Sequence, residues 1–165
     1  MRYLVCVAVL ALAGCGDELS PEEQAREDAE DVAEVRAAQI PPPVPVTLQP
    51  IGFADIEEQG MVGLGCSFLP DNGGENALAI TMGDAAFAKR GGEVMRLAPD
   101  RGSADNPLGT QVKYDGREFS MELDLLDSEG EQVGMETMGY EARLTLTDGR
   151  DRVLYRADGT AQCGA

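Results

Sequence analysis

The sequence predicts an all-β fold, a small antiparallel β-barrel or sandwich preceded by an acidic helix and a Pro-rich linker. Apolar and polar residues alternate with a period of two over residues 119–125 and 142–147, which is typical of strands with one buried and one solvated face. Glycine-containing turn signals near such segments indicate tight hairpins. These signals are Gly91-Gly92, Asp115-Gly116, Asp148-Gly149 and Asp158-Gly159.

The start of the chain has the pattern of an export signal. Arg2 provides a positive charge, and residues 3–13 form an uncharged, almost wholly apolar run. This run is too short to cross a ~30 Å hydrocarbon core as a permanent helix. We therefore interpret residues 1–14 as a signal peptide.

The four residues Leu12, Ala13, Gly14 and Cys15 resemble the lipobox of bacterial lipoproteins. The resemblance implies that Cys15 is acylated and becomes the first residue of the mature chain, which anchors it stably because each buried methylene contributes about 0.8 kcal/mol. It also implies a place in the bacterial cell envelope, facing the periplasm. We expect the outer membrane, because Gly16 is not the acidic residue that retains enteric lipoproteins in the inner membrane. An aspartate one place later keeps the inner membrane as the alternative.

Residues 15–40 are expected to form the lipidated N-terminus and an acidic stalk helix. Ser20, Pro21 and Glu23 make a capping box with proline at the first helical position. This block holds nine acidic residues against two arginines, and its apolar stripe is thin. We therefore expect a solvated helix that ends near Gln39.

A Pro-rich linker and a β domain complete the chain. Residues 41–46, with the sequence PPPVPV, favour an extended, semi-rigid spacer. Residues 47–165 are then the β domain, which is long enough for one modest core. It is expected to open with a short helix before Gly60 and to continue with seven or eight strands. Their expected ranges are 61–68, 77–82, 84–90, 93–98, 110–114, 117–126, 140–147 and 151–157.

The lipoprotein resemblance also accounts for two of the four cysteines. Cys6 leaves with the signal peptide and Cys15 carries lipid, so two thiols remain in an oxidising compartment, where such thiols usually pair. We expect a disulfide between Cys66 in the first strand and Cys163 just after the last. It contributes up to about 4.7 kcal/mol on the chain-entropy account. A two-cysteine zinc site is the alternative, which the absence of histidine disfavours.

The charge of the chain restricts its partners. A formal net charge of −17 is repelled by phosphate backbones, which excludes nucleic acid as a natural partner. A basic protein or a cation is attracted instead, and solubility alone is the plainer explanation of the acidity. We predict no cofactor, and we expect the soluble domain to be monomeric.

We predict neither catalytic residues nor an enzyme activity. Without histidine, a Ser-His-Asp or Cys-His arrangement is impossible, and the chain has no GxxxxGK[ST] loop for phosphate. Residues 125–136 approach the pattern of a calcium loop, but Leu125 occupies the first position, where a carboxylate is required. We interpret this segment as a flexible acidic hairpin loop and predict no metal site.

Two stretches carry a further resemblance. GLGCSFLPDNGG, residues 63–74, and RLAPDRGSADNPLG, residues 96–109, resemble a group of uncharacterised exported alphaproteobacterial proteins, over about residues 53–120. The expected acidic, lipidated and disulfide-clamped barrel is also similar in architecture to the membrane-bound inhibitors of C-type lysozyme. That similarity implies a tethered protein-interaction or structural module, an inhibitor of a basic partner such as lysozyme. The alternative is a domain that binds a small ligand or a cation at the mouth of its barrel.

Overall fold

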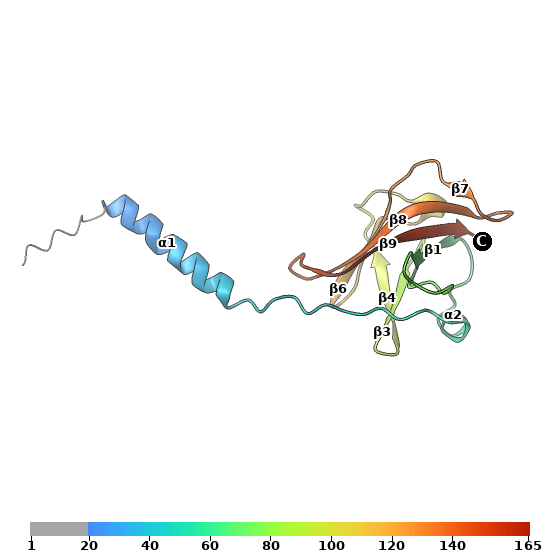
Figure 1. Ribbon diagram of the computed structural model, residues 1–165, viewed down its shortest axis with the longest axis horizontal. Coiled ribbons are helices and arrows are strands. Elements are labelled where there is room, and N and C mark those ends of the chain that lie inside the picture. The colour runs from blue at the N-terminus through green and yellow to red at the C-terminus, as the bar shows by residue number, and fades with distance from the viewer. Residues whose placement is uncertain (1–19) are drawn as a thin grey trace, which may run out of the picture. The chain divides into compact units, whose positions relative to one another are not determined.

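The computed structural model describes residues 20–165, which belong to two compact parts that meet between Pro42 and Pro43. The first part contains helix α1, Pro21–Ala38 (Figure 1). Its capping box is formed as predicted: the Glu23 N–H donates to Ser20 Oγ at 3.3 Å, and the Ser20 N–H donates to the Glu23 carboxylate at 3.0 Å. Gln39 is the C-cap, and no residue of the helix is buried.

The second part begins within the expected linker. The Val46 N–H donates to the Leu154 carbonyl oxygen at 3.0 Å, and the Val46 side chain packs against the core. Leu48 is itself a core residue. Residues 43–46 therefore lie with the β domain, because Val46, unlike the proline before it, has an amide to donate and an apolar side chain to bury.

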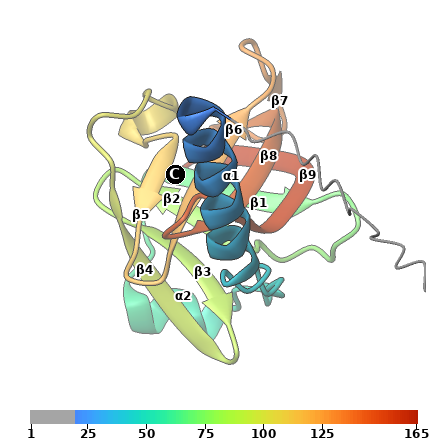
Figure 2. The ribbon, with the colours of Figure 1, turned by 90° about the vertical axis from the view of Figure 1, so that its left-hand side faces the viewer.

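The β domain is an antiparallel barrel of eight strands (Figures 1 and 2). Each strand pairs with the next along the barrel, and β9 pairs back with β1 to close it. The closure by β6–β8 and β1–β9 makes this a barrel and not a sandwich. The strands are β1 Gly65–Pro70, β2 Ala79–Met82, β3 Ala86–Arg90, β4 Glu93–Pro99, β5 Lys113–Asp115, β6 Phe119–Leu125, β8 Met138–Asp148 and β9 Val153–Gly164.

The predicted alternation of side chains is confirmed in the strands that carried it. Phe119, Met121 and Leu123 of β6 face the interior, and Ser120 and Glu122 between them are more exposed. Strand β8 contributes further interior residues in register with β6. The side chains that fill the barrel include Phe68, Leu97, Tyr114, Met121, Leu123, Leu144 and Leu146. The interior is thus a packed core.

A second, smaller core lies outside the barrel, under helix α2, Phe53–Gln59. Ile80 of β2 and Phe87 of β3 point away from the interior and pack with Ile51 and Met61. Helix α2 ends at Gly60, whose φ of 66° is the left-handed conformation that glycine adopts at a helix C-cap. The short helix predicted before Gly60 is therefore confirmed.

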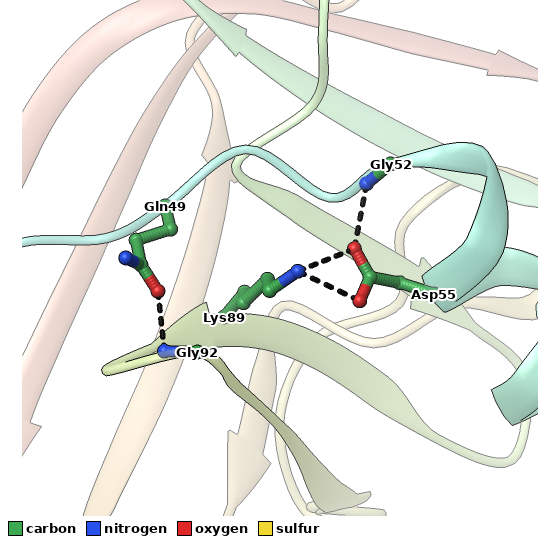
Figure 3. A network of polar contacts seen from close by, with 5 residues as sticks. All are labelled: Gln49, Gly52, Asp55, Lys89 and Gly92. Carbon is green, nitrogen blue, oxygen red and sulfur yellow. Dashed lines mark hydrogen bonds and ion pairs between the residues drawn. The ribbon is translucent and has the colours of Figure 1, made fainter.

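A polar network fastens this segment to the β3–β4 hairpin (Figure 3). Both carboxylate oxygens of Asp55 accept from Lys89 Nζ at 2.8 Å, and one of them also accepts from the Gly52 N–H. The Lys89 hydrogen bond, with the one from Gly52, lowers the pKa of Asp55 below its ordinary value. The Gln49 side chain accepts from the Gly92 N–H at 2.6 Å. These contacts hold residues 49–55 across the outside of β3.

Three of the four predicted turn signals join strands. Gly91-Gly92 is the two-residue link between β3 and β4, with both φ values positive, at 62° and 87°. Asp115-Gly116 and Asp148-Gly149 begin longer links, residues 116–118 and 149–152. In the second, the Arg152 guanidinium holds the pKa of Asp148 down at about 2.

The fourth turn prediction, Asp158-Gly159, is wrong because both residues lie inside β9. Gly159 pairs with Pro70 on one side and Ala142 on the other. A Cβ at this position would collide with the Leu69 carbonyl oxygen. The glycine permits close approach of β1 and β9, and the strand continues to Gly164 instead of ending near residue 157.

A shortened chain that starts at Pro43 is expected to melt at the same temperature as one that starts at Gly16, because α1 buries none of its residues. A chain that starts at Thr47 loses the Val46 hydrogen bond and its packing, so its melting temperature should fall by a few degrees, on the order of 1 kcal/mol. Thermal unfolding of the three chains followed by circular dichroism checks this. An equal loss in both shortened chains would show that α1 contributes to the stability of the barrel.

Candidate functional site

The disulfide predicted between Cys66 and Cys163 is present. The two residues face each other directly in the β1–β9 pairing, with Cα atoms 4.0 Å apart, and both are buried. Cys163 lies within β9 and not after the last strand, because that strand passes through Gly159 without turning. Cys15 and the predicted signal peptide lie outside the described residues, so the signal peptide and the lipidation both stay predictions.

The loops of the barrel gather at two ends. Val46, where the chain joins the barrel, pairs with Leu154 near the first residue of β9. We name this end of the barrel the entry end. It carries the links 71–78, 91–92, 116–118 and 149–152. We name the opposite side the far end. It carries the links 60–64, 83–85, 100–112 and 126–137, the last of which includes the short strand β7, Glu131–Gln132.

Charge is unevenly divided between the two ends. The far-end links contain seven acidic residues and one basic residue, Arg101, whose guanidinium donates to the Gly83 carbonyl oxygen. The entry-end links contain four acidic and three basic residues. The seven far-end acids are Asp84, Asp100, Asp105, Asp127, Glu129, Glu131 and Glu136. The far end therefore carries most of the negative potential of the loops.

The far end also exposes large apolar side chains. Met135 is 97% exposed and Val62 is 77% exposed. Leu64, Leu108, Leu126 and Val133 in the same set of links are exposed as well. Apolar side chains that gather on an exposed surface with polar neighbours mark interaction sites. Sequence reasoning missed this set, because its members come from three links that only the barrel brings to one end.

The link 126–137 is an ordered hairpin that projects beyond the strands in Figures 1 and 2. Strand β7 pairs with β8, and the N–H groups of Val133 and Gly134 both donate to the Thr137 carbonyl oxygen. Met135 lies at the tip of this turn. The acidic hairpin loop predicted for this segment is therefore confirmed as a hairpin, and its backbone hydrogen bonds give it a defined shape. Within residues 20–165 there is no group of three or more cysteine, aspartate or glutamate side chains placed to hold a metal ion.

A pocket of about 450 Å³ opens at the entry end, between the β3–β4 hairpin and the β5–β6 link; we name it the mouth pocket. Its apolar lining residues are Met95, Leu97 and Phe119, of which Leu97 and Phe119 are almost fully buried. Its rim carries charges of both signs, from Arg90, Glu93, Arg117 and Glu118.

Tyr114 is a buried titratable side chain with a structural role. Its hydroxyl donates to the Met82 carbonyl oxygen and accepts from the Gln111 N–H, both at 2.8 Å. Burial raises the pKa of this phenol. The hydroxyl therefore joins the link 100–112 to the end of β2 and holds this link in place at the far end of the barrel.

Among residues 20–165 there is no helix with the length and apolar character needed to span a membrane. Comparison of the chain with protein-family models, with curated proteins and with solved structures finds no match in any of the three. The candidate functional sites of the β domain are therefore the acidic and apolar far end and the mouth pocket.

Proposed function

We propose that this protein is a lipid-anchored module of the bacterial cell envelope that faces the periplasm and binds a basic protein with the far end of its barrel. The observation that carries the proposal is the composition of that end. Seven acidic side chains and six exposed large apolar side chains lie in links that hold a single arginine. Negative potential attracts a basic partner over a distance, and apolar side chains add affinity once contact is made.

The shape of the far end supports the same proposal. The β7 hairpin is held by backbone hydrogen bonds, so Met135 is presented without a large ordering cost on binding. Val46, where the chain joins the barrel, pairs with Leu154 at the opposite end. A projecting loop and a complementary charge are the features that we expect of an inhibitor of a basic enzyme such as a C-type lysozyme.

The anchoring half of the proposal rests on the lipobox resemblance and has its own test. Cys15→Ser is expected to abolish labelling with radioactive palmitate and to leave the protein uncleaved or released from membranes. Labelling of the variant at the level of the unchanged protein would contradict the lipid assignment. Sucrose-gradient separation of the two membranes is expected to place the unchanged protein in the outer membrane.

The binding half is tested by reversing charge at one end of the barrel at a time. We expect the chain from Gly16 onward to bind a C-type lysozyme, and the pair Glu131→Lys and Glu136→Lys to weaken binding by at least about tenfold, because both carboxylates lie in the β7 hairpin. Surface plasmon resonance at low salt and at about 0.5 M salt measures both the affinity and its screening.

The matched control reverses the same number of charges at the entry end, with Asp71→Lys and Glu75→Lys. It should change the affinity by less than about threefold, since these residues act only through the long-range field. Equal losses in the two double variants would show that net charge alone attracts the partner. Met135→Ser should weaken binding without changing its dependence on salt, which separates the apolar contact from the charged ones.

A further inference from the structure

The mouth pocket at the entry end has the composition of a binding site for a small ligand. Its volume of about 450 Å³ lies within the range of about 300–1,000 Å³ that is usual for such sites. It is distinct from the surface proposed above for a basic protein, because it opens at the other end of the barrel. The charges on its rim decide which class of ligand it accepts.

Two arginines that border the pocket are already engaged. The Arg96 guanidinium lies 3.1 Å from the Asp84 carboxylate and 6.0 Å from the centre of the Phe87 ring, on the outer face of the barrel. Arg90 lies 2.9 Å from the Glu118 carboxylate. It also lies 5.8 Å from the centre of the Phe119 ring. The Arg90–Glu118 pair has no net charge. The methylene groups of Arg90 add apolar surface to the pocket.

The other two rim charges are available to a ligand. Neither Glu93 nor Arg117 has a hydrogen bond or ion pair from its side chain to another of the described residues. They come from the start of β4 and from the β5–β6 link, which both line the pocket, and they do not form an ion pair with each other. A ligand that fits between them needs an anionic group for the guanidinium and a cationic group for the carboxylate.

The geometry points to a free amino acid with an apolar side chain as the ligand of the mouth pocket. Arg117 binds its carboxylate in the fork arrangement that guanidinium favours, and Glu93 accepts hydrogen bonds from its ammonium group. The half-buried Met95 provides apolar surface against which the side chain packs, together with the small exposed parts of Leu97 and Phe119. A simple cation does not fit this site, because two arginines share the rim with the two glutamates.

L-Phenylalanine and two of its relatives test this assignment on the full chain purified from cells. 3-Phenylpropionate lacks the ammonium group, and phenethylamine lacks the carboxylate. Equilibrium dialysis with radioactive ligands should show saturable binding of L-phenylalanine and binding at least about tenfold weaker for each relative, since each has lost one charge-assisted contact. Absence of saturable binding of L-phenylalanine up to about 10 mM overturns the proposal.

Two variants assign the roles of the rim residues. Arg117→Gln should bind L-phenylalanine and phenethylamine equally, because the carboxylate no longer has its partner. Glu93→Gln should bind L-phenylalanine and 3-phenylpropionate equally, because the ammonium has lost its partner. Both side chains are exposed, so neither change disturbs the core.

Arg150→Gln is the matched control, because it removes one positive charge from an exposed residue at the same end and does not border the pocket. It should leave all three affinities unchanged. Equal behaviour of Arg117→Gln and Arg150→Gln overturns the proposal, as does equal binding of the three ligands to the unchanged protein. The far-end charge reversals should not affect L-phenylalanine binding, so the proposed amino-acid site and the proposed protein-binding surface are tested independently.

Discussion

Removal of the disulfide, by replacing both Cys66 and Cys163 with alanine, is expected to lower the free energy of unfolding by up to about 4.7 kcal/mol. The bridge joins residues 97 apart in the sequence, and it restricts the unfolded chain far more than the folded one. Six residue pairs join β1 to β9, and we expect their backbone hydrogen bonds to keep the barrel closed without the bridge, so the far-ultraviolet circular dichroism spectrum should not change.

Denaturant titration of the oxidised protein, the reduced protein and the double variant measures this effect. The reduced protein is the matched control, because it keeps both sulfur atoms in the core and lacks only the bond between them. An unchanged denaturant midpoint after complete reduction would contradict the expected contribution. Free thiols at these positions in protein taken directly from the periplasm would contradict the assignment of the bridge to the native state.

The second large effect is expected at Gly159, where alanine should destabilise the barrel by more than about 3 kcal/mol. The added Cβ meets the Leu69 carbonyl oxygen and the Pro70 Cα, which are backbone atoms that cannot move without breaking the pairing of β1 with β9. Since that pairing closes the barrel and contains the disulfide, the loss should reach the whole domain and not one hairpin.

Gly149→Ala is the control for this prediction. Gly149 lies in the β8–β9 link with nothing within 4 Å of an added Cβ, so its replacement should change stability by less than about 0.5 kcal/mol. Denaturant midpoints of the two variants give the comparison. Similar, small effects at the two positions would mean that the close approach of β1 and β9 is not required.

The elements that the sequence predicted well depend on residues close together in the chain. Ser20 and Glu23 form the cap of α1 within one helical turn, so their types and spacing are enough to place the start of that helix. The alternation in β6 and β8 reflects a backbone that turns successive side chains to opposite faces. Gly91-Gly92 links β3 to β4 because two adjacent residues supply the positive φ values that a tight hairpin needs.

The predictions that failed, or that the sequence left open, depend on residues far apart in the chain. Asp158-Gly159 has the composition of a turn, yet the approach of β1, about 90 residues earlier, makes that glycine part of a strand. The choice between barrel and sandwich was open because β6 pairs with β8 although the long link 126–137 separates them in the chain. Nothing local to Val46 shows that Leu154 accepts its N–H.

By itself, the sequence determined the all-β class, the capped acidic helix, most strand positions and the two cysteines that pair. Only the tertiary structure decided which links share an end of the barrel, and therefore that Val62 and Met135 lie on one surface and that Glu93 and Arg117 border one pocket. The physical reason is that helix caps and strand alternation arise from interactions within a few residues. Barrel closure is a set of long-range pairings that is selected by the packing of the whole core.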